Sequence, residues 1–146
     1  MREELATEAD TEALGERLAG QLGAGDLVVL DGPLGAGKTV LVRGIARGLG
    51  VHGVVTSPTF VIARTHRPGA RGIGLVHVDA YRLVGAGDLA GELDALDLDT
   101  DLESAVVVVE WGQGVVEALT ARHLLVRLGR AADTETRTAS WEWVRR

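Results

Sequence analysis

The sequence predicts a single α/β domain in which buried strands alternate with helices. Two short runs, Leu27–Leu30 and Ala105–Val109, carry only apolar side chains. Runs of this kind, without alternation of apolar and polar residues, are typical of strands buried on both faces of a parallel sheet. The chain has 146 residues, of which 46% are hydrophobic, and this suits one domain with its own core. No repeat or linker divides the sequence, so we expect residues 1–146 to form one domain.

Helices are expected on both sides of the first buried strand. Asp10 or Thr11 is the expected N-cap of an amphipathic helix over Glu12–Leu22, whose leucines fall on one stripe. A second helix is predicted over Thr39–Leu49, directly after a glycine-rich turn. A shorter helix is predicted near Gly114–Leu119, after the second buried strand.

Four further segments are predicted as strands. Phe60–Thr65 and Gly72–Asp79 flank a turn that contains Pro and Gly, which favours a hairpin. Leu124–Leu128 and Ala139–Val144 are predicted as closing strands near the end of the chain. The acidic stretch Gly85–Ser104 has leucines at irregular spacing, so we expect short helices and loops there.

The composition argues against several classes of protein. Cysteine is absent, which excludes disulfides and thiolate metal sites, and the net charge of −6 argues against a general nucleic-acid coat protein. The longest apolar run has far fewer residues than the roughly 20 that span a membrane. The chain opens without an apolar signal segment, so we expect a cytoplasmic protein. His52, His66, His77 and His123 lack the spacing of zinc ligands.

A glycine-rich segment between the first buried strand and the following helix predicts a phosphate-binding loop. Residues 32–39 read Gly-Pro-Leu-Gly-Ala-Gly-Lys-Thr, a complete G-x-x-x-x-G-K-T pattern. Its glycines allow backbone N–H groups to surround a phosphate, and Lys38 adds a positive charge. Lys38 is also the only lysine in the chain. The alternative is a glycine-rich turn that holds a surface lysine by chance. The expected phosphate-binding residues are Leu34, Gly35, Ala36, Gly37, Lys38 and Thr39.

Two carboxylates follow buried strands and are candidate magnesium ligands or catalytic groups. Glu110 ends the run Ala105–Val109, and Asp79 ends Gly72–Asp79. The Thr39 hydroxyl of the loop pattern provides one ligand for Mg²⁺, and a carboxylate is expected to provide another. Either carboxylate alone is equally well explained as the cap of a turn. Both together, in a chain with a phosphate loop, favour function.

Four motifs in order resemble those of the bacterial tRNA threonylcarbamoyladenosine biosynthesis ATPase family (TsaE, formerly YjeE). These motifs are Gly35-Ala-Gly-Lys-Thr39, Ser57-Pro-Thr-Phe60, His77-Val-Asp-Ala-Tyr-Arg82 and Glu110-Trp111. The resemblance covers nearly the whole chain, more loosely after Trp111, and it implies an α/β, P-loop NTPase-like fold. In that fold a largely parallel central sheet is flanked by helices and has antiparallel additions.

The resemblance also implies a function. Members of the family bind ATP and Mg²⁺ and hydrolyse ATP alongside TsaB and TsaD. Their joint task is the threonylcarbamoyl modification of an adenosine beside the anticodon of tRNAs that read codons beginning with A. The TsaE-like subunit drives or resets the complex without transferring the group itself, so its contact with tRNA is expected to be indirect, through the complex.

The family's site residues map onto this sequence motif by motif. Lys38 and the loop backbone would bind phosphates, and Thr39 and Glu110 would hold Mg²⁺, with Lys38, Asp79 and Glu110 as the catalytic group. Asp79 would lie near the attacking water or in a second metal shell. Trp111 packs on the nucleotide or fills the core behind Glu110, and the core is the favoured interpretation.

Three further positions are expected to contact the nucleotide. Thr11 fits a threonine that the family carries on its N-terminal helix. Thr59 lies about twenty residues after the loop, where segments that sense the γ-phosphate often occur. The alternative for Thr59 is a turn ordered by Pro58. Arg82 would contact phosphate or a partner, or would simply be solvated surface.

Two rival functions share the loop. A small P-loop kinase would need an acceptor pocket and an arginine-bearing lid, and the acidic stretch after Gly85 contains no arginine. A nucleotide-dependent regulatory switch of the GTPase class generally reads guanine with an N/T-K-x-D segment. That segment needs a second lysine, which this chain lacks. We therefore expect ATP as the nucleotide.

Overall fold

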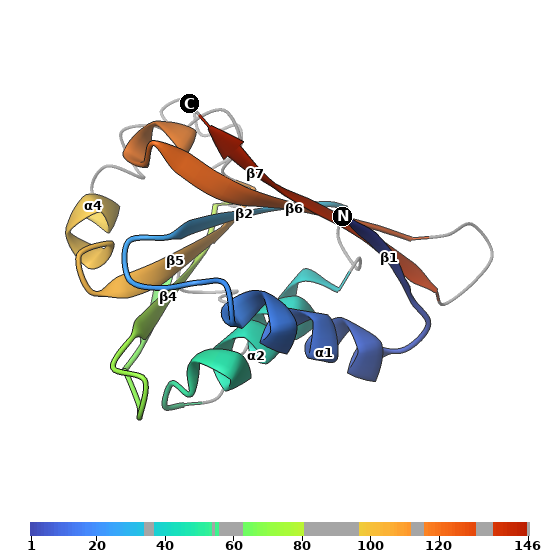
Figure 1. The fold of residues 1–146 in the computed structure, drawn as a ribbon, viewed down its shortest axis with the longest axis horizontal. Coiled ribbons are helices and arrows are strands. Elements are labelled where there is room, and N and C mark those ends of the chain that lie inside the picture. The colour runs from blue at the N-terminus through green and yellow to red at the C-terminus, as the bar shows by residue number, and fades with distance from the viewer. Residues whose placement is uncertain are drawn as a thin grey trace.

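The computed structural model describes residues 1–33, 37–53, 55, 63–80, 97–111, 116–130 and 136–145. Within these residues the strands form one seven-stranded mixed sheet in the order β1-β7-β6-β2-β5-β4-β3 (Figure 1). The central strands β6, β2, β5 and β4 are parallel, and the pairs β1–β7, β6–β7 and β3–β4 are antiparallel. The expected α/β architecture with antiparallel additions is therefore observed.

The strand bounds agree with most of the predicted segments. They are β1 Arg2–Leu5, β2 Leu27–Asp31, β3 Ala63–His66, β4 Gly74–Asp79, β5 Ala105–Glu110, β6 Arg122–Arg130 and β7 Arg137–Arg145. Strands β2 and β5 contain the two apolar runs, and every side chain from Leu27 to Leu30 is fully buried. Strands β3 and β4 form the expected hairpin. Strand β1 was not predicted, because its residues are mostly charged.

The helices lie on both faces of the sheet. Helix α1 (Glu8–Ala19) and helix α2 (Lys38–Leu49) pack side by side on one face (Figure 1). The short helix α4 (Leu98–Asp101) and the 3₁₀ helix η2 (Val116–Leu119) contribute side chains to the core on the other face. Among the described residues, no helix has the length and apolar character needed to cross a bilayer.

Helix α1 begins earlier than the sequence pattern predicted. The expected helix is observed, but its predicted bounds Glu12–Leu22 and the N-cap at Asp10 or Thr11 were wrong. Thr7 is the N-cap: its hydroxyl accepts a bond of 3.2 Å from the Asp10 amide, and the Asp10 carboxylate accepts one of 3.1 Å from the Thr7 amide. This reciprocal capping box satisfies two backbone donors that a helix start otherwise leaves free.

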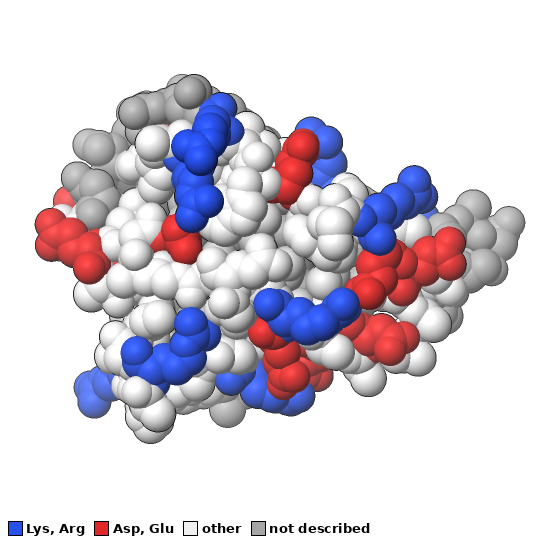
Figure 2. Space-filling model, viewed as in Figure 1, with Lys and Arg blue, Asp and Glu red and all other residues white. Residues whose placement is uncertain are grey.

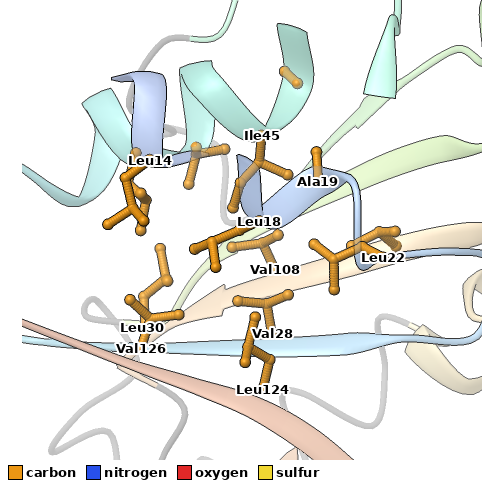
Figure 3. Packing of buried hydrophobic residues seen from close by; sticks show 14 of the residues in the cluster. Leu14, Leu18, Ala19, Leu22, Val28, Leu30, Ile45, Val108, Leu124 and Val126 are labelled. Atoms are coloured by element: carbon orange, nitrogen blue, oxygen red, sulfur yellow. The ribbon is translucent and has the colours of Figure 1, made fainter. Parts of the chain in front are cut away.

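The main core lies between the helix pair and the sheet (Figure 3). Side chains of α1 and α2, including Leu14, Leu18 and Ile45, meet Val28 of β2 and Val108 of β5 there (Figure 3). A second cluster on the opposite face includes Leu27, Val29 and Val107 of the same strands together with residues of α4 and η2. Burial on both faces explains why these strands are apolar throughout.

Helices α1 and α2 approach each other closely because glycines line their contact. A Cβ atom on Gly44 would lie 2.0 Å from the Glu12 carbonyl oxygen, and one on Gly15 would lie 2.4 Å from the Leu41 carbonyl oxygen. At the carboxyl ends of both helices the Arg71 guanidinium donates hydrogen bonds of 3.1–3.2 Å. Their acceptors are the carbonyl oxygens of Ala19, Leu22 and Gly48. The two helices therefore form one tightly joined unit.

Charged side chains of both signs are interspersed over the helix pair. Figure 2 shows acidic and basic groups next to one another on this face. Arg17 pairs with Glu3 of β1, and Arg47 of α2 pairs with Glu12 and Glu16 of α1. The described part of this face thus has no single large basic area of the kind that binds nucleic-acid backbones.

Candidate functional site

The glycine-rich segment joins the end of β2 to the start of α2. Gly32 comes directly after β2 and lies against β6. A Cβ atom on Gly32 would be 2.4 Å from the Leu128 carbonyl oxygen. Gly37 is the N-cap of α2 and has φ +97°, a left-handed conformation that glycine adopts at low cost. Because Gly37 has no side chain, α2 begins without a side-chain cap and its first N–H groups are left for another acceptor.

Lys38 opens helix α2 and is buried, with only 5% of its surface exposed. Its Nζ atom donates a hydrogen bond of 2.7 Å to the Gly32 carbonyl oxygen and lies 3.9 Å from the centre of the Trp111 ring. Burial lowers the pKa of Lys38 below its ordinary value, and the negative charges of Glu110, Asp79 and Asp31 act in the opposite direction. Lys38 is therefore a buried cation on which three carboxylates act electrostatically.

Two of those carboxylates end neighbouring parallel strands. Asp79 of β4 is the register partner of Glu110 of β5, and the Ala80 amide donates a 2.9 Å bond to the Glu110 carbonyl oxygen. Val108 packs in the core beneath the helix pair, so Glu110, two residues further on, lies on the same face of the sheet. Leu75 places Asp79 on that face by the same alternation. The structure thus brings Lys38, Asp79 and Glu110 together on the α2 side of the sheet.

Glu110 is also bonded to a histidine that the sequence analysis did not assign to the site. His77 lies two residues before Asp79 on β4, is fully buried, and its Nε2 atom is 2.5 Å from Oε2 of Glu110. Its Nδ1 atom has no hydrogen-bond partner among the described residues. His77 begins one of the four family motifs, but the only individual role considered for it was that of a metal ligand. The signal that would have found His77 is its i, i+2 spacing from Asp79, which puts both side chains on one face.

Thr11 and Thr39 flank the start of α2. Thr11 lies in the first turn of α1, only 2% exposed, and its Cγ2 atom is 3.8 Å from the position that a Cβ on Gly37 would take. Its hydroxyl donates a bond of 3.5 Å to the Thr7 carbonyl oxygen. Thr39 is the second residue of α2 and is half-buried. Both threonines therefore lie at the start of α2, Thr11 next to Gly37 and Thr39 next to Lys38 in the chain.

The remaining predicted site residues lie outside the described part of the chain. They are Leu34, Gly35, Ala36, Thr59 and Arg82. Their contacts with a nucleotide stay predictions.

A cavity of about 560 Å³ opens next to the end of β2. It is lined by Asp31, Gly32, Pro33 and Trp111, and by residues of β1, β6 and β7. Trp111 has φ +65°, a left-handed conformation uncommon for a residue with a side chain. It lines this cavity, its ring centre is 3.9 Å from Nζ of Lys38, and it is a partly buried residue that packs against the second core cluster. This packing agrees with the core interpretation of Trp111.

The described residues contain no group of three or more His, Cys, Asp or Glu side chains arranged to hold a metal ion by themselves.

Fold and site together define a class: a mixed α/β protein whose charged residues meet beyond the carboxyl ends of parallel strands, where such sheets bind their ligands. Residues 5–139 match the family model described as "Threonylcarbamoyl adenosine biosynthesis protein TsaE". The chain therefore belongs to the TsaE family, and its role is in tRNA threonylcarbamoyladenosine biosynthesis. The family that the four motifs indicated is confirmed.

Individual relatives agree with the family match. A Mycobacterium tuberculosis protein named tRNA threonylcarbamoyladenosine biosynthesis protein TsaE is 61% identical over 139 residues, covering 93% of this chain and 83% of the relative. A Bacillus subtilis protein of the same name is 35% identical over 127 residues, covering 86% and 75%. The crystal structure of YdiB from Bacillus subtilis is similar with a TM-score of 0.73 and 27% identity. That match covers 97% of this chain and 83% of YdiB.

Proposed function

We propose that this chain is a cytoplasmic, Mg²⁺-dependent ATPase with a P-loop NTPase fold. It acts with TsaB and TsaD homologues in the threonylcarbamoyl modification of adenosine in tRNAs that read codons beginning with A. The observation that carries the proposal is the position of Lys38. The only lysine of the chain is buried at the start of α2, directly after a glycine-rich segment and next to the carboxylates that end β4 and β5.

The start of α2 suits a phosphate group. The left-handed Gly37 leaves the first amides of the helix uncapped, and a helix N-terminus carries a partial positive charge. The Lys38 ammonium adds a full charge beside those amides, and its bond to Gly32 keeps it at the base of the segment. These donors would hold the β- and γ-phosphates of ATP, with Thr11 next to them across Gly37.

The oxygen ligands near Lys38 fit Mg²⁺. This ion prefers carboxylate and hydroxyl oxygens and usually takes only one or two protein ligands, the rest coming from phosphates and water. The Glu110 carboxylate and the Thr39 hydroxyl would hold it, which is compatible with the lack of an all-protein metal cluster among the described residues. The bound ion would neutralise charge on the phosphates. Asp79, beside Glu110, would orient the attacking water.

Contact with tRNA is proposed to be indirect, through the partner proteins. The chain carries a net charge of −6, and the acidic and basic groups over the helix pair are mixed (Figure 2). Proteins that bind nucleic-acid backbones directly neutralise phosphates with clustered Lys and Arg.

The proposal is tested by calorimetry and phosphate release. The purified chain should bind ATP in the presence of Mg²⁺, prefer it to GTP, and release phosphate when mixed with TsaB and TsaD homologues. A reaction containing all three proteins should depend on this chain for threonylcarbamoyladenosine formation in tRNA. Transfer of the γ-phosphate to a small molecule would instead identify a kinase. Binding that changes assembly without any turnover would identify a regulatory switch.

A further inference from the structure

The interior of strand β4 contains one polar side chain among apolar ones. His77 lies between Val76 and Val78, and none of its surface is exposed. A buried polar group is unfavourable unless it finds a hydrogen-bond partner, so a histidine here requires an explanation. An aliphatic residue would fill the same space beneath α2 without that penalty. The contact that distinguishes the histidine is the 2.5 Å bond between its Nε2 atom and Oε2 of Glu110.

We propose that His77 is a positioning residue that holds the Glu110 carboxylate in the orientation needed to bind Mg²⁺. The inference deepens the proposed function, because Glu110 is the carboxylate assigned to the ion there. Nε2–H donates to Oε2, so the other oxygen, Oε1, remains for the metal. Carboxylates that ligate metals are themselves held by hydrogen bonds, and removing such a bond typically weakens metal affinity on the order of 10–100-fold.

The burial of Glu110 makes this bond important. Glu110 is only 4% exposed, so water cannot replace a lost donor freely. The proposed role of Glu110 also implies which nitrogen of His77 carries the hydrogen of this bond. A carboxylate that binds a metal ion has no proton to donate, so the hydrogen lies on Nε2. The other ring nitrogen, Nδ1, has no hydrogen-bond partner among the described residues.

Three substitutions of His77 distinguish a role in positioning Glu110 from a role in packing alone. In His77→Gln the amide nitrogen reaches about as far from the backbone as Nε2, so the donor to Glu110 is retained. In His77→Asn the amide is shorter and corresponds to Nδ1, so the donor is lost although the residue stays polar. His77→Leu removes every donor while keeping apolar volume.

The expected result is a split between magnesium and nucleotide binding. We expect the Mg²⁺ dissociation constant of the ATP-bound protein to rise on the order of 10–100-fold in His77→Asn and His77→Leu, and to stay close to wild type in His77→Gln. ATP affinity without Mg²⁺ should change little in all three, because Lys38 and the loop provide it. Equal magnesium affinity in His77→Gln and His77→Asn would overturn the proposal, and this pair suffices even where His77→Leu does not fold.

A double-mutant cycle tests whether His77 acts through Glu110. In a Glu110→Gln background, His77→Asn should cause no further loss of magnesium affinity, because the ligand it positions is already gone. Losses that simply add would show that His77 acts on the whole fold and would overturn the proposal.

One measurement needs no nucleotide and no metal. Nitrogen NMR of the ligand-free protein should show His77 with its proton on Nε2, and a proton on Nδ1 alone would overturn the proposal. This result stands apart from the proposed function. If the wild-type chain bound no Mg·ATP, the ATPase assignment and the magnesium role of His77 would both fail. The NMR measurement would still show whether Nε2 of His77 carries the proton that is donated to Glu110.

Discussion

The ammonium group of Lys38 and the carbonyl oxygen of Gly32 are joined by a hydrogen bond of 2.7 Å. This bond connects the two ends of the glycine-rich segment, and Lys38 is only 5% exposed. The lysine side chain therefore does not extend into solvent. It is held at the base of the segment by one carbonyl and one aromatic ring, at 3.9 Å from the centre of Trp111.

Replacing Lys38 should remove nucleotide binding. In Lys38→Ala the uncapped amides of α2 remain, but the positive charge beside the β- and γ-phosphates is lost. We expect calorimetry to show no measurable binding of Mg·ATP. Arg47→Ala is the matched control, since it removes a cation near the other end of α2, where Arg47 pairs with Glu12 and Glu16. ATP affinity unchanged in Lys38→Ala would refute the assignment of the phosphate site.

ATP affinity should also depend on pH through Lys38. Burial lowers the pKa of Lys38, so its ammonium loses the proton at a lower pH than an ordinary lysine, whose pKa is about 10.4. The folded protein holds this proton less firmly than the unfolded chain. Protonated Lys38 therefore disfavours folding at neutral pH, and this penalty fades as pH rises from the lowered pKa of the folded protein to the ordinary pKa of the unfolded chain, about 10.4.

Phosphate binding has the opposite pH dependence, because it needs the charged form. We expect the ATP dissociation constant to increase as pH rises through the lowered pKa of Lys38. Titrations from about pH 7 to about pH 10 would measure this. Lys38→Arg provides the control, because a guanidinium does not titrate in that range. A dissociation constant that rises equally in both proteins would assign the effect to another group.

Glu110→Gln should separate binding from hydrolysis. The amide keeps the size of the side chain, but it is a weaker ligand for Mg²⁺ than a carboxylate. We expect ATP to bind and phosphate release to fall strongly, measured at saturating ATP over a magnesium series. Asp79→Asn is the comparison, since Asp79 is the register neighbour of Glu110. Full activity in Glu110→Gln with loss of magnesium dependence in Asp79→Asn would reverse the two roles.

The isolated chain should hydrolyse ATP slowly and respond to its partners. Fast phosphoryl transfer commonly needs an arginine at the developing charge, worth ~10³–10⁵-fold in rate. In the described part of the chain, Lys38 is a cation that interacts electrostatically with Asp79 and Glu110. The sequence has no arginine within residues 32–39. Turnover alone and with TsaB and TsaD homologues, for wild type and Arg82→Ala, would measure this. High turnover by the lone wild-type chain, unmoved by partners, would favour an independent enzyme such as a kinase.

The close contact between α1 and α2 should tolerate no added methyl group. In Gly44→Ala the new Cβ would lie 2.0 Å from the Glu12 carbonyl oxygen, so the helices must separate. Overpacking typically costs about 1–3 kcal/mol, which exceeds the gain of up to about 1 kcal/mol from replacing glycine in a helix. Urea denaturation should therefore show a loss of stability. Gly23→Ala, whose Cβ would meet nothing within 4 Å, should stay within about 0.5 kcal/mol of wild type.

The parallel core was predictable because its sequence signal is local. Strand β2 is apolar over Leu27–Leu30 and strand β5 over Ala105–Val109, and the loop pattern marks the turn between β2 and α2. Strand β1 has no such signal: Arg2, Glu3 and Glu4 pair with β7 through backbone bonds, and their partners are more than 130 residues away. The N-cap was misplaced for a related reason. Asp10 resembles a cap in isolation, but its carboxylate reaches back to Thr7, which makes it the third residue of the helix.

From the sequence, only the part of the site that lies at the ends of strands was predictable. Asp79 and Glu110 end parallel strands, and parallel strands end on one edge of a sheet, so their proximity follows from the pattern. The role of His77 depends on the register between β4 and β5, which brings its Nε2 atom to Glu110. Register is a property of the paired strands and is not encoded in either segment alone.

The bonds of Arg71 to the carboxyl ends of both helices have a mechanical consequence. Arg71 holds Ala19 and Leu22 at the end of α1 and Gly48 at the end of α2, while glycines hold the helices together along their length. The two helices are therefore expected to move as one unit. A protein that displaced α1 would move Thr11 and the adjacent Gly37 together. Such a movement would carry the start of α2, where we propose that phosphate binds, without a hinge between the two long helices.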